Sequence, residues 1–123
     1  MVGRIDGQMS IFEFLPQTAD FTTMPEAEVM DIIGQRIGVR LVYDAKWEEY
    51  SAKIGKLSIT ARISTYKCTH PGSETMIAGR KFISCGWGTT TEGGGGPRDS
   101  IDEAVEYFER AINRIVRKRK NSA

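Results

Sequence analysis

The amino-acid sequence predicts an α+β two-layer domain, in which two helices cover one face of an antiparallel sheet of three to four strands. Three observations lead to this fold class. Apolar residues recur at helical spacing over residues 24–37 and again over residues 101–116. Between these segments, apolar and polar residues alternate in short runs, as in half-buried strands. The predicted order of elements is therefore helix, three or four strands, helix.

The first predicted helix covers residues 24–37. Thr23 and Glu26 have the spacing of a capping box, and Pro25 is favoured in a first helical turn. Gly38 is a natural stop for the helix. The apolar stripe of this segment consists of Val29, Ile32, Ile33 and Ile37.

The predicted strands follow directly. Alternation runs through residues 39–44, 50–54 and 57–64, and a further strand is predicted over residues 80–87. The cleanest alternation is in residues 57–64, which predicts a strand with one buried and one polar face. Gly55 and Lys56 separate two of these runs at hairpin spacing.

Residues 86–100 are rich in glycine and predict an irregular connection. Six glycines fall within residues 86–96, and glycine disfavours regular structure because it loses the most backbone freedom on folding. No P-loop sequence is present, and nearby acids would repel a phosphate. The alternative is a partner-binding surface anchored by Trp87 and Arg98, in which at least one of Gly93–Gly96 would have a positive φ.

The last predicted helix begins at a second capping box, formed by Ser100 and Glu103. Its apolar stripe extends over four turns and consists of Ile101, Ala104, Val105, Phe108, Ala111, Ile112, Ile115 and Val116. The order of elements over residues 24–116 resembles the double-stranded-RNA-binding domain in topology. That family grips phosphates with lysines at the start of its last helix. Here the same place holds Asp99, Asp102, Glu103 and Glu106, so RNA binding through this helix is not expected.

The length of 123 residues indicates one domain, and 40% hydrophobic with 27% charged residues is ordinary for a soluble globular protein. We expect an extended N-terminal arm with a short linear motif at 1–22, a single α+β domain at 23–116 and a basic C-terminal tail at 117–123. The first fifteen residues lack the apolar region of a signal peptide, and no apolar run approaches membrane-spanning length. Cys68 and Cys85 are expected to be free thiols in a reducing environment, so a cytoplasmic location and no membrane partner are predicted.

The sequence carries no pattern typical of catalysis. No paired carboxylates suggest acid–base chemistry, and Cys68, His70 and Cys85 lack a visible fourth ligand for zinc. We therefore expect a protein that is not an enzyme and that has no cofactor or metal.

The C-terminal end is strongly basic. Residues 110–120 contain six basic residues and no acid, whereas residues 1–109 contain eleven basic and sixteen acidic residues. Cations near a helix C-terminus stabilise the helix, so a solvated end is one interpretation. The other is weak, salt-dependent nucleic-acid binding through Arg114, Arg117, Lys118, Arg119 and Lys120.

The string Gln8-Met9-Ser10-Ile11-Phe12 resembles the pentapeptide Gln-Leu-Ser/Asp-Leu-Phe by which bacterial polymerases, repair proteins and initiators bind the replication sliding clamp. Three of its five positions are identical to that motif, and Met9 and Ile11 are close apolar substitutes. The alternative is an N-terminal arm that packs on the domain through Ile11, Phe12, Phe14 and Leu15.

The strings QMSIFEF and GGGGPRDSIDEAVEYF also make the whole chain similar to small uncharacterised proteins of phages and integrative elements of Gram-positive bacteria. The resemblance implies a mobile-element context. Our first hypothesis is an accessory protein that binds a host protein, the sliding clamp, through Gln8–Phe12. The alternatives are an anti-CRISPR-like inhibitor of a host defence nuclease, acting by protein contact, and a nucleic-acid-binding module.

Overall fold

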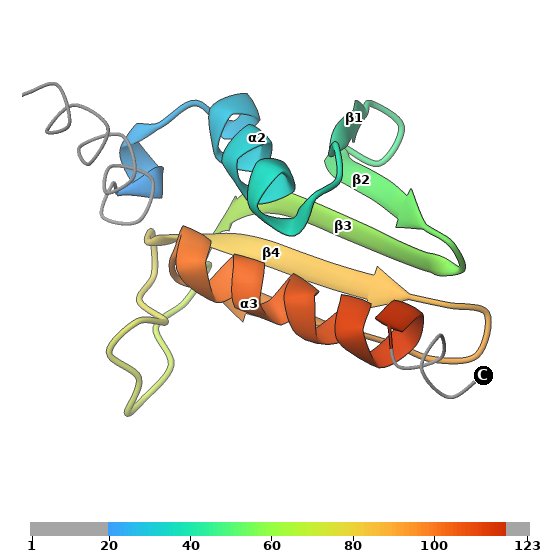
Figure 1. The fold of residues 1–123 in the computed structure, drawn as a ribbon. Helices are drawn as coiled ribbons and strands as arrows, with labels where there is room; N and C mark the ends of the chain where they lie inside the picture. Colours follow the sequence, from blue (N-terminus) through green and yellow to red (C-terminus); the bar gives the residue numbers. More distant parts are fainter. Residues whose placement is uncertain (1–19, 118–123) are drawn as a thin grey trace, which may run out of the picture.

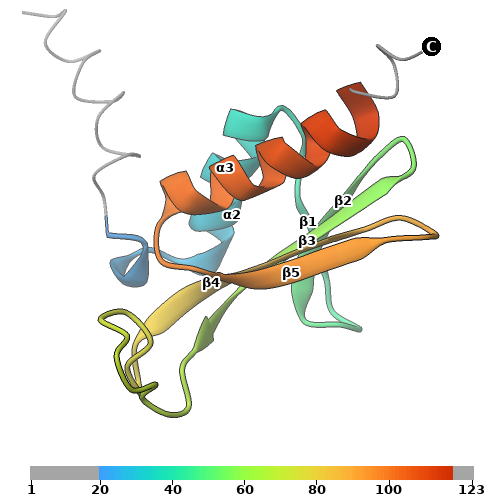
Figure 2. The same ribbon diagram turned by 90° about the horizontal axis from the view of Figure 1, so that it is seen from below.

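The computed structural model describes residues 20–117. Its two main helices are α2 (Glu26–Ile37) and α3 (Ile101–Ile112), and both lie on the same face of one sheet (Figures 1 and 2). A short 3₁₀-helix, η1 (Phe21–Thr23), precedes α2, and a π-helical turn, η2 (Asn113–Arg117), extends α3. Of the part described, neither helix is both long and apolar enough to cross a membrane. The predicted α+β class, with two helices over one sheet face, is confirmed.

The sheet has five antiparallel strands, and their order in the sheet is their order in the chain. The predicted number of three to four strands was too low, because the glycine-rich segment forms a strand of its own. The strands are β1 (Val42–Asp44), β2 (Glu49–Ile54), β3 (Leu57–Thr65), β4 (Lys81–Gly88) and β5 (Gly93–Arg98). The predicted hairpin turn at Gly55 is present, with Ile54 paired to Leu57 and Gly55 at a φ of +61°.

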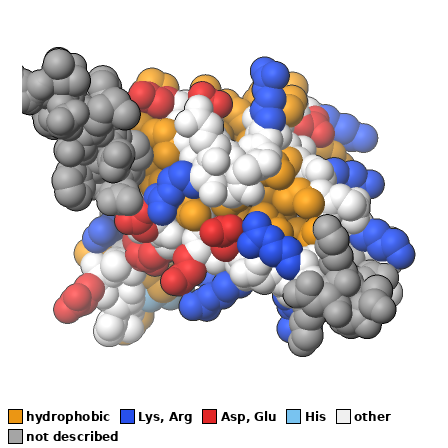
Figure 3. Space-filling view, in the orientation of Figure 1, with side chains coloured by type: hydrophobic (Ala, Val, Ile, Leu, Met, Phe, Trp, Pro, Cys, Tyr) orange, Lys and Arg blue, Asp and Glu red, His pale blue; other side chains and the backbone are white. Residues whose placement is uncertain are grey.

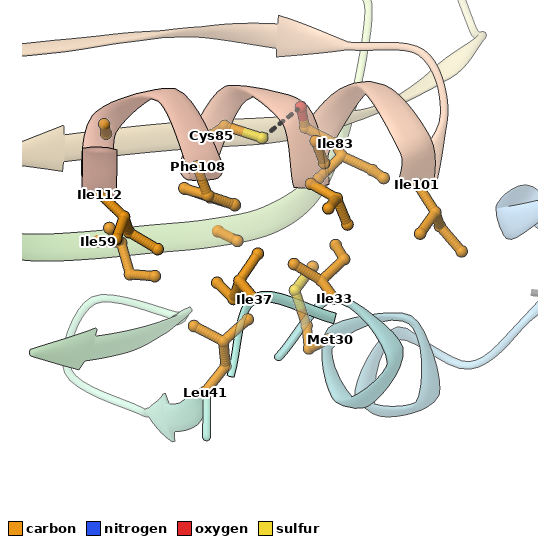
Figure 4. Packing of buried hydrophobic residues seen from close by; sticks show 14 of the residues in the cluster. Met30, Ile33, Ile37, Leu41, Ile59, Ile83, Cys85, Ile101, Phe108 and Ile112 are labelled. Atoms are coloured by element: carbon orange, nitrogen blue, oxygen red, sulfur yellow. Dashed lines mark hydrogen bonds between the residues drawn. The ribbon is translucent and has the colours of Figure 1, made fainter. Parts of the chain in front are cut away.

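The core lies between the sheet and the two helices. Ile59 and Ile83, which are fully buried, project from β3 and β4 toward Phe108 of α3 and Ile33 of α2 (Figure 4). The register places Ile59 opposite Trp87, and Trp87 opposite Gly94 of β5. The alternation predicted for residues 57–64 therefore separates a buried face from a polar face, as expected.

At one of the two predicted capping boxes the N-cap hydrogen bond forms. The Ser100 hydroxyl accepts a hydrogen bond from the Glu103 N–H at 3.1 Å and starts α3 as predicted. The box predicted at Thr23 is wrong: Pro25 is the N-cap of α2, and Thr23 belongs to η1. The Glu26 carboxylate instead accepts a hydrogen bond from the Ile63 N–H at 2.9 Å, and so ties the start of α2 to β3.

Candidate protein-binding surface

The glycine run Gly93–Gly96 is extended backbone paired along its whole length to β4. The predicted irregular connection is therefore wrong for these residues. The positive φ expected of a binding loop is also wrong, since the described glycines with positive φ are Gly38, Gly55, Gly72 and Gly79. The physical reason is that β4 supplies a ladder of backbone hydrogen bonds, which local propensity does not include.

The indole of Trp87 fills the space that a side chain at Gly94 would occupy. A Cβ atom at Gly94 would lie 3.0 Å from Trp87 Nε1 and 3.5 Å from the Tyr107 hydroxyl. Trp87 is directly opposite Gly94 in the register, and it packs against the hydrophobic core while staying partly exposed. A large aromatic ring across a glycine offsets the missing side chain, which explains how a glycine strand is held in the sheet.

Arg98 and Tyr107 complete this cluster. The Arg98 guanidinium carbon lies 4.4 Å from the centroid of the Tyr107 ring, and Arg98 Nη1 donates to the Pro97 carbonyl at 2.7 Å. The predicted anchors Trp87 and Arg98 thus lie on the same face, the face covered by the helices. Both are only partly exposed, and both already have partners within the chain.

The Tyr107 hydroxyl is buried and makes no hydrogen bond within the described part of the chain. Burial raises the pKa of Tyr107, and the nearby Arg98 charge opposes that shift. The Trp87 indole also faces this hydroxyl and acts to lower its pKa, but the two groups do not reach hydrogen-bond geometry. Tyr107 is not among the predicted site residues, and its only signal in the sequence is its position at the border of the α3 apolar stripe.

A second surface is a groove between α2 and the edge strand β1. The groove has a volume of about 490 Å³ and is lined by Ala27, Glu28, Asp31, Arg40, Leu41, Val42, Tyr43 and Tyr50. The rings of Tyr43 and Tyr50 contact each other with centroids 5.2 Å apart. Burial, reinforced by the Glu26 charge, raises the pKa of Tyr50. Trp47, which is 61% exposed, lies in the turn that joins β1 to β2.

Local pattern did not reveal this groove, because it is formed where a helix meets a distant strand. Its acidic wall comes from Glu28 and Asp31 of α2, and its aromatic wall comes from Tyr43 and Tyr50 of the sheet. A groove with one acidic and one aromatic wall is suited to a basic or apolar peptide.

Two of the predicted nucleic-acid-binding residues are described, and both contact acids. Arg114 donates to Glu92 Oε1 through Nε at 3.2 Å and through Nη2 at 2.9 Å. Arg117 donates to Asn113 at 2.6 Å and lies 3.9 Å from the Glu109 carboxylate. Lys118, Arg119 and Lys120 lie outside the described residues. These ion pairs lower the net positive charge that the start of the tail presents.

The predicted linear motif, Gln8, Met9, Ser10, Ile11 and Phe12, also lies outside the described residues. Within residues 20–117 no three His, Cys, Asp or Glu side chains form a group that could hold a metal. Cys68 is exposed, whereas Cys85 is buried in the core and burial raises the pKa of its thiol to about 12. Comparisons with protein-family models, curated proteins and solved structures found no match.

Proposed function

We propose that this protein is a non-enzymatic accessory protein of a phage or mobile element that binds the replication sliding clamp of its host. The observation that carries the proposal is the pentapeptide Gln8-Met9-Ser10-Ile11-Phe12. The Gln8 amide offers both a donor and an acceptor, and Ile11 and Phe12 are apolar side chains suited to a groove. Burial of two such side chains contributes roughly 3–6 kcal/mol before the cost of ordering the peptide.

The organisation of the domain supports a separate role for this peptide. Buried residues between Phe21 and Ile115 supply a hydrophobic core to which both helices and the sheet contribute. The described residues therefore contribute a core of their own, and the proposal assigns Ile11 and Phe12 to the groove of the partner.

The test is direct binding to a purified bacterial sliding clamp, measured by isothermal titration calorimetry. We expect a micromolar dissociation constant, which corresponds to a binding free energy of about −8 kcal/mol and is reasonable for a short extended peptide. Combined Gln8→Ala and Phe12→Ala substitution should abolish binding. Phe14→Ala, two residues beyond the motif, is the matched control and should bind as the wild type does.

Melting temperatures of the same variants distinguish the alternative. A Phe12→Ala protein that melts several degrees lower, with no clamp binding by the wild type, would show that the arm belongs to the core. An unchanged melting temperature together with lost binding is the result that supports the motif.

A second candidate function is inhibition of a host defence nuclease by protein contact. It is favoured by the groove between α2 and β1, whose acidic Glu28 and Asp31 would complement the basic surface of a nucleic-acid enzyme. If this function holds, the protein should inhibit a defence nuclease, and Asp31→Lys should relieve the inhibition without changing clamp binding. Inhibition that is equal for wild type and Asp31→Lys would exclude the groove.

A further inference from the structure

The outer edge of β5 is an exposed strand edge whose residues have almost no side chains. β1 and β5 are the two edges of the sheet, and β1 has only three residues whereas β5 has six. Gly93, Gly94, Gly95 and Pro97 are all exposed. Edge strands present unpaired N–H and C=O groups that can pair with another strand, and most proteins block them with charge or irregularity.

The hairpin that joins β4 to β5 determines which groups point outward. The Thr89 N–H donates to the Glu92 carbonyl at 2.8 Å, so Thr89 and Glu92 form a hydrogen-bonded pair. Such pairs alternate along antiparallel strands, so Gly94, Gly96 and Arg98 bond to β4. The backbone groups of Gly93, Gly95 and Pro97 therefore point away from the sheet. Pro97 has no N–H, and it lies at an outward position, where the strand does not donate a hydrogen bond to β4.

We propose that β5 pairs antiparallel with β5 of a second copy of this chain, about a two-fold axis at Gly95. In this register Gly95 lies opposite Gly95 of the second copy, and Gly93 lies opposite Pro97 of the second copy. The two Gly95 residues exchange both hydrogen bonds, and each Gly93 N–H donates to the second lone pair of a Pro97 carbonyl, whose first lone pair accepts from Arg98 Nη1. Every outward donor of β5 is then used, and the two sheets form one continuous sheet of ten strands.

Charge complementarity favours β5 of a second copy as the strand that pairs with this edge. The same register places Glu92 of each copy directly opposite Arg98 of the other, twice in the dimer. Both side chains lie on the helix face, since Glu92 contacts Arg114 and Arg98 contacts Tyr107. Among the described residues the Glu92 carboxylate accepts only from Arg114, and both bonds go to Oε1, which leaves Oε2 for Arg98 of the second copy. Directly opposite charges of unlike sign stabilise a strand pair.

Helix α3 has a charge distribution that suits the same symmetry. Its beginning is acidic and its end is basic, and Figure 3 shows acidic side chains gathered over its N-terminal part. A two-fold axis sets the two α3 helices antiparallel. The acidic beginning of each helix then lies toward the basic end of the other, which is the attractive orientation.

The test is sedimentation velocity of the full chain at low salt, from low micromolar to several hundred micromolar. We expect the wild type to pass from monomer to dimer as concentration rises. Glu92→Arg alone and Arg98→Glu alone should each dimerise about tenfold more weakly, because two attractive cross-strand pairs become repulsive. An equimolar mixture of the two variants should recover the dimer, since each heterodimer again pairs unlike charges.

Controls separate the register from general effects of charge. Arg62→Glu changes an exposed residue of β3 far from the edge and should dimerise as the wild type does. Pro97→Ala adds an N–H opposite the Gly93 carbonyl of the second copy and should tighten the dimer. A wild type that stays monomeric throughout, or single variants that dimerise as strongly as the wild type while melting normally, would overturn the proposal.

Discussion

The Tyr107 hydroxyl shows how one residue can carry an energetic cost within a well-packed cluster. It lies against Trp87 and above Gly94, burial raises its pKa, and it has no hydrogen-bond partner among the described residues. A buried polar group that gives up water without a replacement costs about 1–3 kcal/mol. The contact between Arg98 and the ring offsets part of that cost, because a guanidinium over an aromatic face contributes about 0.5–1 kcal/mol.

Tyr107→Phe should therefore raise the free energy of unfolding by about 1 kcal/mol, because it removes the buried hydroxyl and keeps the ring. Urea unfolding at neutral pH measures this change. Tyr66→Phe is the control, since the Tyr66 hydroxyl donates to Asp99 at 3.4 Å and its removal should not stabilise. Equal destabilisation by both substitutions would mean that Tyr107 does have a hydrogen-bond partner.

Among the elements, β5 depends most on its neighbours. A strand of consecutive glycines has the highest entropic cost of ordering, and it is held here by pairing to β4 and by the Trp87 ring. Gly93 and Gly95 are also backed closely by β4, since Cβ atoms there would lie 2.9 Å and 3.1 Å from the carbonyls of Trp87 and Cys85. These close approaches, rather than flexibility, account for glycine at these positions.

Gly94→Ala should lower the free energy of unfolding by about 1–3 kcal/mol, because its Cβ must displace the Trp87 indole. Gly88→Ala is the matched control in β4, where the nearest atom to a new Cβ is 3.8 Å away. That substitution should be neutral or slightly stabilising, since alanine restricts the unfolded chain. Both effects can be measured by thermal unfolding. Identical behaviour of the two variants would contradict the proposed role of Trp87.

At the scale of the whole molecule, burial raises the pKa of one thiol and three phenol groups, so these groups keep their protons to higher pH. It raises the pKa of Cys85 to about 12 and also raises the pKa values of Tyr50, Tyr66 and Tyr107. Above the ordinary thiol value of 9.0, the unfolded chain loses the Cys85 proton while the folded chain keeps it. The folded state then binds more protons, so its stability falls as the pH rises.

The free energy of unfolding should accordingly decrease from about pH 9 upward, with Cys85 contributing at most about 1.4 kcal/mol per pH unit. Cys85→Ala should flatten this dependence between pH 9 and pH 12, whatever its effect at neutral pH. Cys68→Ala, which removes the exposed thiol, is the control for loss of a cysteine. Urea titrations at a series of pH values give the slopes, and equal slopes for wild type and Cys85→Ala would refute the assignment.

The basic tail gives a prediction for the whole chain as well. Arg114 makes two hydrogen bonds to Glu92, whereas Arg117 lies 3.9 Å from the Glu109 carboxylate without a hydrogen bond to it, so the residues expected to bind nucleic acid are Arg117, Lys118, Arg119 and Lys120. Binding should be weak and independent of base sequence, with a salt slope no steeper than about −4 for four phosphate contacts. Deletion of residues 117–123 should abolish retention on a phosphate-bearing column without changing stability much. Unchanged retention would exclude the tail.

The sequence by itself determined both helices, the strands β1 to β4 and the start of α3 at Ser100, because these depend on periodicity and capping within short segments. It also indicated the polar face of β3 and the polarity of charge along α3. Only the tertiary structure decided that Gly93–Gly96 form a strand, that Glu26 binds the backbone of Ile63, and that Tyr43 and Tyr50 form the wall of a groove. Each of these depends on partners distant in the sequence. The glycine run in particular has no intrinsic preference for a strand. Its conformation is set by the β4 ladder and the Trp87 ring.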